Sequence, residues 1–247
     1  MTSNALGVIF DLDGTLIDSM RSFYDLVVSN LEQRNLRISI ESLKKVGTEL
    51  IEDYKTAPSG QGLRLVISLF WKIGRKSGLS RLKTIGFSFN CVSKARKVYY
   101  SAPLFADVKK TLLRLQEAGF HLGVYTMASR RQLMETLVKH EINHFFNPKG
   151  LISRNDVKRA KPDPEGVLLA CEMCSIHPSK GVYIGDMPVD VIAGNNAGTI
   201  TIAMTTGLVN RRIFEQYCHP TAIFDSLEQA TTWILQTISP NSPNLIF

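Results

Sequence analysis

The 247-residue chain is 44% hydrophobic and 21% charged, a composition typical of a soluble globular protein with one large domain or two smaller ones. Its most apolar stretch, residues 65–71, is far shorter than the ~20 residues that a membrane span needs. The N-terminus lacks the features of a signal peptide, and four cysteines are too few for a disulfide framework. We therefore expect a cytoplasmic protein that has no membrane partner.

The net charge of +7 is concentrated in one part of the chain. Residues 19–103 contain fifteen basic and six acidic residues, and the stretch from Lys55 to Ala106 contains no acidic residue. The rest of the chain has a net charge of −2. The sequence therefore divides into a basic insert and a mildly acidic remainder.

Residues 6–10, LGVIF, form a short apolar run that predicts a buried strand. Asp11 and Asp13 follow it, so extended backbone would direct both carboxylates to the same side, and Gly14 allows a sharp turn after them. Two neighbouring carboxylates repel each other unless a cation or a shared proton relieves the repulsion. The pattern indicates either a functional acidic pair or an acidic turn after an edge strand.

The basic insert, residues 18–103, has apolar residues at helical spacing and no strong alternating strand pattern. Asp18 or Ser19 is suited to cap its first helix. Segments rich in glycine or proline, Gly86 among them, separate the expected helices. These helices cover residues 19–31, 40–54, 61–76 and 88–100. We therefore predict an all-helical domain.

After Asp107 helices and strands alternate along the chain. Asp107 is expected to cap a helix that Gly119 ends. Further helices are predicted over residues 129–140, 162–174, 188–197 and 226–238, and strands over 120–125, 151–152, 181–184, 199–204 and 222–224. This alternation implies parallel strands joined by right-handed crossovers. We predict an α/β fold, a doubly wound parallel sheet of the Rossmann-like type formed by residues 1–17 and 104–247, with the helical domain 18–103 inserted.

Polar residues gather where the predicted strands end, and ligands bind beyond the carboxyl ends of the strands in open α/β sheets. The set comprises Asp11, Asp13, Thr126 and Asp186, together with Lys161 and Asp190 at helix starts. Three carboxylates without a histidine suit a hard cation such as Mg²⁺, and a hydroxyl with a lysine suits a phosphoryl group. One carboxylate can attack phosphorus and a second can move the proton. This inventory favours phosphoryl transfer through a covalent intermediate.

The spacing of these residues resembles a known family. DLDGT at residues 11–15, Thr126, Lys161 in AKPDP and GDMPVD at residues 185–190 follow the order of the four motifs of the haloacid dehalogenase-like (HAD) hydrolase superfamily. The helical insert between the first two motifs is similar to the type 1 cap of phosphoglycolate phosphatase-like members. The resemblance implies a Rossmann-like core with a cap that closes over the substrate and excludes water.

The resemblance also implies roles for the matching residues. Asp11 would be the nucleophile and Asp13 the acid and base, while Thr126 would hold the phosphoryl group and Lys161 would neutralise charge. Mg²⁺ would be bound by Asp11, by the backbone carbonyl of Asp13 and by Asp186, and Asp190 would orient Lys161 or support the metal shell.

Two further positions are candidates for substrate binding. Met127 stands where Asn or Ser often follows the hydroxyl residue of the second motif, and its backbone N–H can still contact phosphate. Gly47 and Thr48 are expected between the first two helices of the insert, at a position that resembles a cap loop facing the site. We expect Met127, Gly47 and Thr48 to affect substrate selectivity more than catalysis.

The resemblance implies a Mg²⁺-dependent phosphatase that hydrolyses a small phosphomonoester, such as phosphoglycolate, through an aspartyl-phosphate. A dehalogenase usually lacks the second Asp of the pair, and a phosphonate hydrolase usually has Ala in place of Gly14. A phosphosugar mutase would carry Gly-x-Ser-Arg where this chain has GTEL at residues 47–50. A mutase, or a non-catalytic module that binds phosphate or a partner, stays open as an alternative.

The basic insert allows two interpretations. It can steer or contact an anionic phosphorylated substrate, or it can be a solvated basic face. The candidates for contact are Lys72, Arg75, Lys76, Arg81 and Lys83. No nucleic-acid-binding motif accompanies the charge, so we do not expect nucleic acid as a partner.

Overall fold

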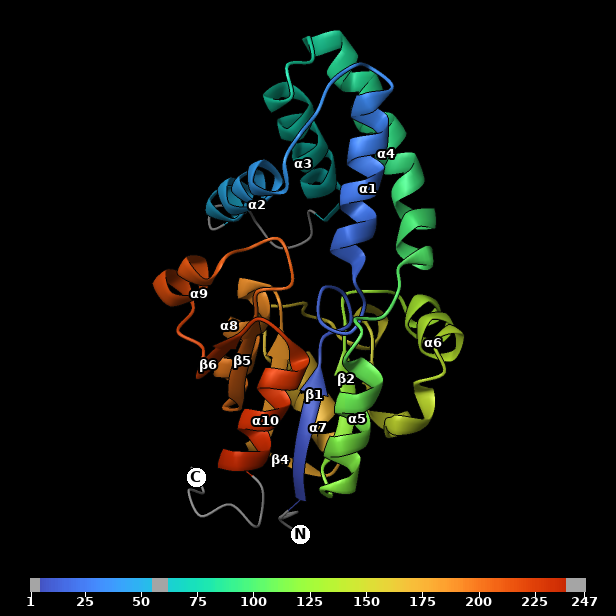
Figure 1. The fold of residues 1–247 in the computed structure, drawn as a ribbon. Coiled ribbons are helices and arrows are strands. Elements are labelled where there is room, and N and C mark those ends of the chain that lie inside the picture. The colour runs from blue at the N-terminus through green and yellow to red at the C-terminus, as the bar shows by residue number, and fades with distance from the viewer. Residues whose placement is uncertain (1–4, 55–61, 239–247) are drawn as a thin grey trace. The chain divides into compact units, whose positions relative to one another are not determined.

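The structure is a computed structural model that describes residues 5–54 and 62–238 (Figure 1). The chain divides into two compact units. The first, here called the sheet unit, comprises Met1–Asp18, Pro103–Gly207 and Arg211–Phe247. The second, the helical unit, comprises Ser19–Ala102 together with the short segment Leu208–Asn210. The sequence did not indicate that this short segment belongs with the helices.

The sheet unit is built on six parallel strands in the order β3-β2-β1-β4-β5-β6. β1 is buried along almost its whole length, which explains its continuous apolar sequence. The strand order reverses direction between β1 and β4, the place where doubly wound sheets bind ligands. The strands are β1 (Ala5–Phe10), β2 (His121–Tyr125), β3 (Leu151–Ile152), β4 (Ile176–Gly185), β5 (Ile200–Met204) and β6 (Ala222–Phe224). The predicted fold class is confirmed.

Helices cover both faces of this sheet (Figure 1). α5 and α10 pack together on one face, and α7 and α8 pack together against the central strands on the other. The helices of the sheet unit are α5 (Val108–Glu117), α6 (Arg130–Lys139), α7 (Glu165–Met173), α8 (Pro188–Ala197), α9 (Arg211–Tyr217) and α10 (Leu227–Thr237). The apolar core under α7 contains Cys171 and Cys174, where burial raises the pKa of the thiols to about 12 and about 11.

The local predictions for the sheet unit were wrong in three details. Asp107 does not cap its own helix: its Oδ2 accepts a hydrogen bond from the Glu228 N–H at 2.9 Å, at the start of α10. The sequence-based interpretation also missed α9 and placed the start of β4 too late, at residue 181. For Asp107 and for the start of β4, where Ile176 pairs with Ala5, the partner is distant in the sequence, and a local pattern does not contain it.

The helical unit consists of α1 (Ser19–Glu32), α2 (Ile40–Tyr54), α3 (Gly62–Lys76) and α4 (Arg81–Ser101). Its core draws on all four helices, for example through Leu31, Val46, Phe70 and Phe87. The Phe70 and Phe87 rings meet edge to face at 6.3 Å between centroids. The predicted helical insert therefore has its own apolar core.

α4 begins seven residues earlier than predicted, and Gly86 lies inside it instead of separating two helices. A glycine in a helix interior costs about 1 kcal/mol relative to alanine. Burial of Phe87 and Cys91 on the same turns offsets that cost. α4 has 21 residues, yet within the described ranges no helix, α4 included, combines the length and the apolar content needed to cross a bilayer.

Candidate active site

The turn after β1 brings the chain against the end of β4. The Asp11 N–H donates to the Ile184 carbonyl at 2.8 Å, which extends the pairing of the two strands. Gly14 then has a φ of +73°, and a Cβ at this position would lie 2.1 Å from Asp186 Oδ2. Glycine is therefore required twice over, for the left-handed backbone and for the close approach to Asp186.

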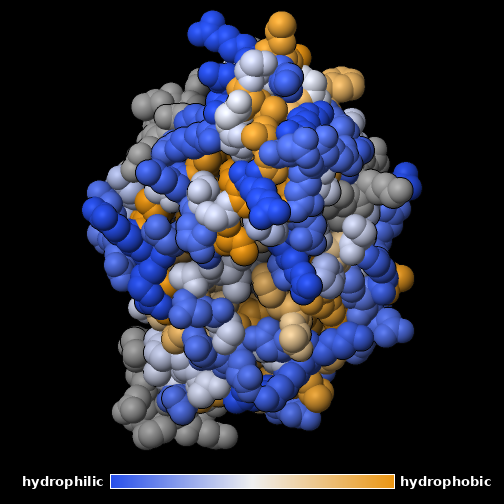
Figure 2. Space-filling view, turned by 45° about the horizontal axis from the view of Figure 1, so that its top comes forward, coloured by the Kyte–Doolittle hydropathy of each residue, from blue (hydrophilic) through white to orange (hydrophobic). Residues whose placement is uncertain are grey.

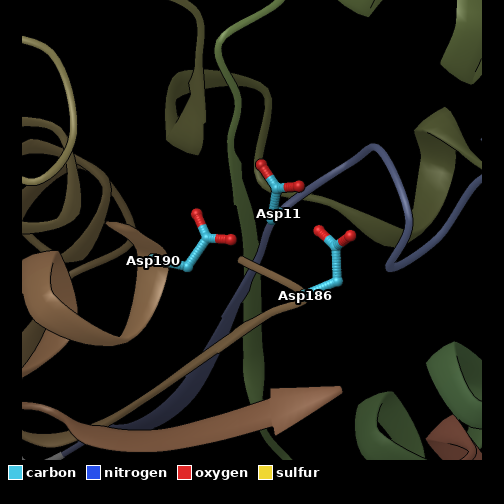
Figure 3. Close-up of side chains that lie close together, drawn as sticks. All are labelled: Asp11, Asp186 and Asp190. Carbon is cyan, nitrogen blue, oxygen red and sulfur yellow. The ribbon is translucent and has the colours of Figure 1, made fainter. Parts of the chain in front are cut away.

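Three predicted carboxylates meet at this edge of the sheet. Asp11 follows β1, Asp186 follows β4, and Asp190 lies in the first turn of α8. All three are buried, and each contributes a carboxylate oxygen within 4.8 Å of the others. Figure 3 shows their carboxyl groups directed toward a common point. The carboxyl group of Asp13 is not a member of this cluster.

Lys161 lies inside the same cluster. Its Nζ is 2.6 Å from Asp11 Oδ1 and 2.7 Å from Asp190 Oδ1, and its side chain is 2% exposed. The ammonium group also lies 4.8 Å from the centroid of the Tyr125 ring and 5.4 Å from that of Tyr183. The two tyrosines stand at or near the ends of β2 and β4, and sequence reasoning missed them because they resemble ordinary core aromatics.

Asp190 is held from several sides. Its Oδ1 accepts hydrogen bonds from Lys161 and from the Tyr183 hydroxyl at 3.2 Å, and its Oδ2 accepts from the Met187 N–H at 3.0 Å. A Cβ at Gly185 would overlap the Asp190 side chain, so glycine lets the start of α8 approach the strand end. Both carboxylate oxygens of Asp190 are therefore already engaged by the protein.

The cluster holds three carboxylates and one ammonium group, which leaves two negative charges when all are ionised. Burial, with Asp190 adding to it and Lys161 opposing it, raises the pKa of Asp11 to about 6. Burial and the neighbouring carboxylates hold the pKa of Asp186 well above its usual range. For Lys161, burial lowers the pKa, but Asp11 and Asp190 outweigh it and keep the pKa well above its usual value. The site thus requires bound protons or a cation to balance its charge.

This charge excess predicts an unusual pH dependence for the metal-free protein. Because the pKa of Asp11 is raised from 3.8 to about 6, the folded state binds more protons than the unfolded state between these values. The stabilisation that Asp11 gives the folded state is fully present below pH 3.8 and is lost as the pH rises through about 6. The free energy of unfolding therefore falls over this range. Asp186 acts in the same direction.

Replacing Asp186 by Asn removes one of these charges at nearly constant shape. In EDTA we expect the variant to melt about 4 °C above the wild type at about pH 8 and at the same temperature as the wild type at about pH 4. Thermal unfolding followed by circular dichroism measures this difference, with the exposed Asp225→Asn variant as the control. A variant that melts below the wild type at the higher pH contradicts the electrostatic explanation.

Thr126 and Met127 follow β2, the neighbour of β1, and therefore lie at the same edge of the sheet as Asp11. Thr126 is buried, its N–H donates to the Ile152 carbonyl at 3.0 Å, and its Oγ1 accepts from the Ala128 N–H at 3.0 Å. The Met127 side chain is 45% exposed. Both predicted residues are thus at the expected strand end, and their contacts with substrate stay a prediction.

Gly47 and Thr48 lie inside α2, within the predicted helix over residues 40–54, and not between two helices, as their resemblance to a cap loop suggested. Gly47 is buried, and a Cβ at this position would lie 3.2 Å from the Leu208 Cβ. The Thr48 hydroxyl donates to the Lys44 carbonyl one turn earlier at 3.0 Å. The buried residues Leu43 and Val46 are three positions apart, as on one side of a helix. This helical pattern continues through Gly47 and Thr48, so no loop forms here. Their role in substrate binding also stays a prediction.

The segment after β5 contributes contacts that sequence reasoning missed. The Thr206 hydroxyl donates to the Gly14 carbonyl at 2.5 Å. A Cβ at Gly207 would lie 1.8 Å from Asp186 Oδ2, so this glycine, like Gly14, allows backbone to lie against the carboxylate. A signal for them existed, because Thr-Thr-Gly directly follows a predicted strand and polar residues at strand ends had identified the other groups.

Comparison with known proteins agrees with this architecture. The sequence profile of the haloacid dehalogenase-like hydrolases matches residues 8–204. The chain is 27% identical to a phosphoglycolate phosphatase of Psychrobacter arcticus, over 95% of this chain and 98% of that protein. It is 26% identical to the pyrophosphatase PpaX of Oceanobacillus iheyensis, over 91% and 94% of the two chains.

A crystal structure with a similar fold is that of a HAD family hydrolase from Deinococcus radiodurans R1 with bound phosphate and sodium. It superposes with a TM-score of 0.69 at 17% sequence identity, over 94% of this chain and 96% of the other. Since the profile match includes every strand end that contributes to the carboxylate cluster, this chain is an enzyme of the haloacid dehalogenase-like hydrolase family.

Proposed function

We propose that this enzyme is a Mg²⁺-dependent phosphatase that hydrolyses a small phosphomonoester through an aspartyl-phosphate on Asp11. The observation that carries the proposal is the buried contact of Lys161 with both Asp11 and Asp190, beside the carboxylate of Asp186. A lysine so placed holds a nucleophilic carboxylate ionised and oriented. It also supplies positive charge where a phosphoryl group would lie.

The donor set suits Mg²⁺. Its donors are all oxygens, as hard cations prefer, and the cluster has the two excess negative charges that a divalent ion balances. Asp11 and Asp186 are the carboxylate ligands we assign, with the backbone carbonyl of Asp13 beside them. Asp190 is assigned to orient Lys161, because both of its oxygens already accept hydrogen bonds from the protein. When bound, Mg²⁺ would neutralise charge on the phosphoryl oxygens.

The chemistry of the protein's own groups follows in two steps. In the first, an oxygen of Asp11 attacks phosphorus, the ester bond breaks, and Asp13 donates a proton to the leaving alkoxide oxygen. In the second, Asp13 takes a proton from a water molecule, which attacks the aspartyl-phosphate and releases inorganic phosphate. Asp11 is regenerated as a carboxylate and Asp13 as an acid. We assign Thr126 to hold the phosphoryl oxygens during both steps.

The substrate class is tested with a panel of phosphate esters. We expect Mg²⁺-dependent release of phosphate from small phosphomonoesters, with 2-phosphoglycolate the first to try because a relative of nearly full coverage is a phosphoglycolate phosphatase. Pyrophosphate belongs in the panel because a second relative is a pyrophosphatase. EDTA should abolish turnover, and acid quenching with labelled substrate should trap phosphate on the protein.

Each other outcome of this panel has a distinct meaning. Interconversion of glucose 1-phosphate and glucose 6-phosphate without net release of phosphate would identify a phosphosugar mutase. Failure to act on any ester, with Mg²⁺ present and the chain folded, would favour a non-catalytic module. Full activity in EDTA would contradict the assignment of the metal but not that of the nucleophile.

A further inference from the structure

The first half of α4 carries an apolar stripe that the fold does not use. Leu82, Ile85 and Phe89 are spaced along one side of the helix and are 83%, 57% and 77% exposed. The opposite side of the same turns buries Phe87 and Cys91 in the core of the helical unit. α4 is therefore apolar on two faces, and only one of them is covered within the described part of this unit.

Two basic cavities lie at the same end of the helical unit, where α1 meets α2 and α3 meets α4. One, of about 380 Å³, is lined by Arg37, Lys45 and Lys76 together with serine side chains. The other, of about 450 Å³, is lined by Arg34 and Lys83. Among the described residues, no Asp or Glu lines either cavity, and of these cations Lys76 pairs with Glu49 beside the first one. Both are thus suited to anionic groups.

The second cavity adjoins the stripe at the start of α4, and the first lies at the same end of the helical unit. Lys83, which lines the second cavity, directly follows Leu82 in the sequence. Arg81, which precedes Leu82, is exposed as well. The stretch from Lys55 to Ala106 contains ten basic residues and no acidic one. Figure 2 shows apolar side chains interspersed with strongly hydrophilic ones on this unit. An occupant must therefore satisfy exposed apolar side chains and cationic pockets together.

Three kinds of occupant fit this surface poorly. A second copy of the chain would bring two basic surfaces together, which like charge disfavours. A soluble phosphorylated ligand would fill the cavities but leave the stripe in water. A nucleic acid strand stacks on aromatic rings, and two of the three side chains in the stripe are aliphatic.

We propose that the helical unit binds the surface of an anionic phospholipid bilayer through Leu82, Ile85 and Phe89, with lipid phosphate groups in the two basic cavities. Apolar side chains at the boundary between headgroups and acyl chains, with cations at the headgroups, are the two elements of such binding. The protein would lie on the bilayer without spanning it. This proposal replaces the expectation, drawn from the sequence, that the protein has no membrane partner.

The test is co-sedimentation of the full chain with vesicles. We expect binding to vesicles of phosphatidylcholine mixed with phosphatidylglycerol, and binding at least about tenfold weaker to phosphatidylcholine alone or at high salt. The double variant Leu82→Ser and Phe89→Ser should bind the mixed vesicles at least about tenfold more weakly. Its activity toward soluble substrate should equal that of the wild type, which shows that it is folded.

A matched control comes from the sheet unit. Leu113 and Val138 are 47% and 57% exposed on α5 and α6, and their replacement by Ser should leave vesicle binding unchanged. Equal binding of the stripe variant and the wild type, or no preference of the wild type for mixed vesicles, overturns the proposal. The proposal is also overturned if light scattering shows a dimer of the wild type that the double variant Leu82→Ser and Phe89→Ser does not form. Inorganic phosphate binding that Arg37→Ala weakens, without any vesicle binding, would identify a soluble anion site instead.

Discussion

Replacing Asp11 by Asn is expected to lower kcat by roughly 10⁴-fold or more, because an amide oxygen does not form the acyl phosphate that the proposed reaction requires. The variant should stay folded, since its side-chain carbonyl can still accept the hydrogen bond from Lys161 and the cluster loses one negative charge. Initial rates on the best substrate of the panel measure the loss. Circular dichroism checks the fold.

Asp225→Asn is the matched control for this experiment. The Asp225 side chain is 66% exposed, pairs with Arg211 and is not a member of the carboxylate cluster. Its loss should change neither kcat nor the melting temperature appreciably. If Asp11→Asn keeps a tenth or more of the wild-type activity, Asp11 is not the nucleophile, whatever its geometry.

Replacing Lys161 by Met is expected to lower the free energy of unfolding by about 3–5 kcal/mol at neutral pH, the usual cost of removing one partner of a buried ion pair. The methionine keeps most of the packing between the rings of Tyr125 and Tyr183. It leaves Asp11 and Asp190 buried without their cation. Urea unfolding in EDTA measures the cost, and kcat should fall as well, since the variant lacks the charge that we propose for binding the phosphoryl group.

The pH dependence separates this electrostatic cost from a packing defect. Without the ammonium group the pKa of Asp11 rises further in the folded state, so the folded protein gains more protons than the unfolded one as the pH falls. The loss in free energy of unfolding that Lys161→Met causes should therefore be smaller at about pH 5 than at about pH 8. Lys149→Met, at an exposed lysine of the sheet unit, should show no deficit at either pH. A deficit that is equal at both values would identify packing as its cause.

Much of the fold could be predicted from local patterns. The apolar run before Asp11 predicted β1 because parallel strands are buried on both faces. The start of α6 could be read from Ser129, whose side chain accepts from the Gln132 N–H in a capping box. Gly198 directly follows the predicted helix over residues 188–197, and it ends α8 in the left-handed conformation. These features depend on residues a few positions apart, so they are legible without the tertiary structure.

The predictions that were wrong depended on distant residues. Gly86 was expected to break a helix, but packing of the turns around it against the rest of the helical unit outweighs its low propensity. Asp107 was expected to cap its own helix, but its carboxylate instead accepts from the start of α10, which is 121 residues away. Gly47 was expected near a loop, and it lies instead in a helix against Leu208.

The sequence by itself determined which groups stand at the carboxyl ends of the strands, because the alternation of strands and helices places these ends at one edge of a parallel sheet. Only the tertiary structure decided which of those groups contact one another. It brings Lys161 to Asp11 across 150 residues, engages both oxygens of Asp190, and places Gly14 and Gly207 against Asp186. These are contacts of a few ångströms between segments that lie far apart in the sequence. The spacing of residues along the chain does not contain them.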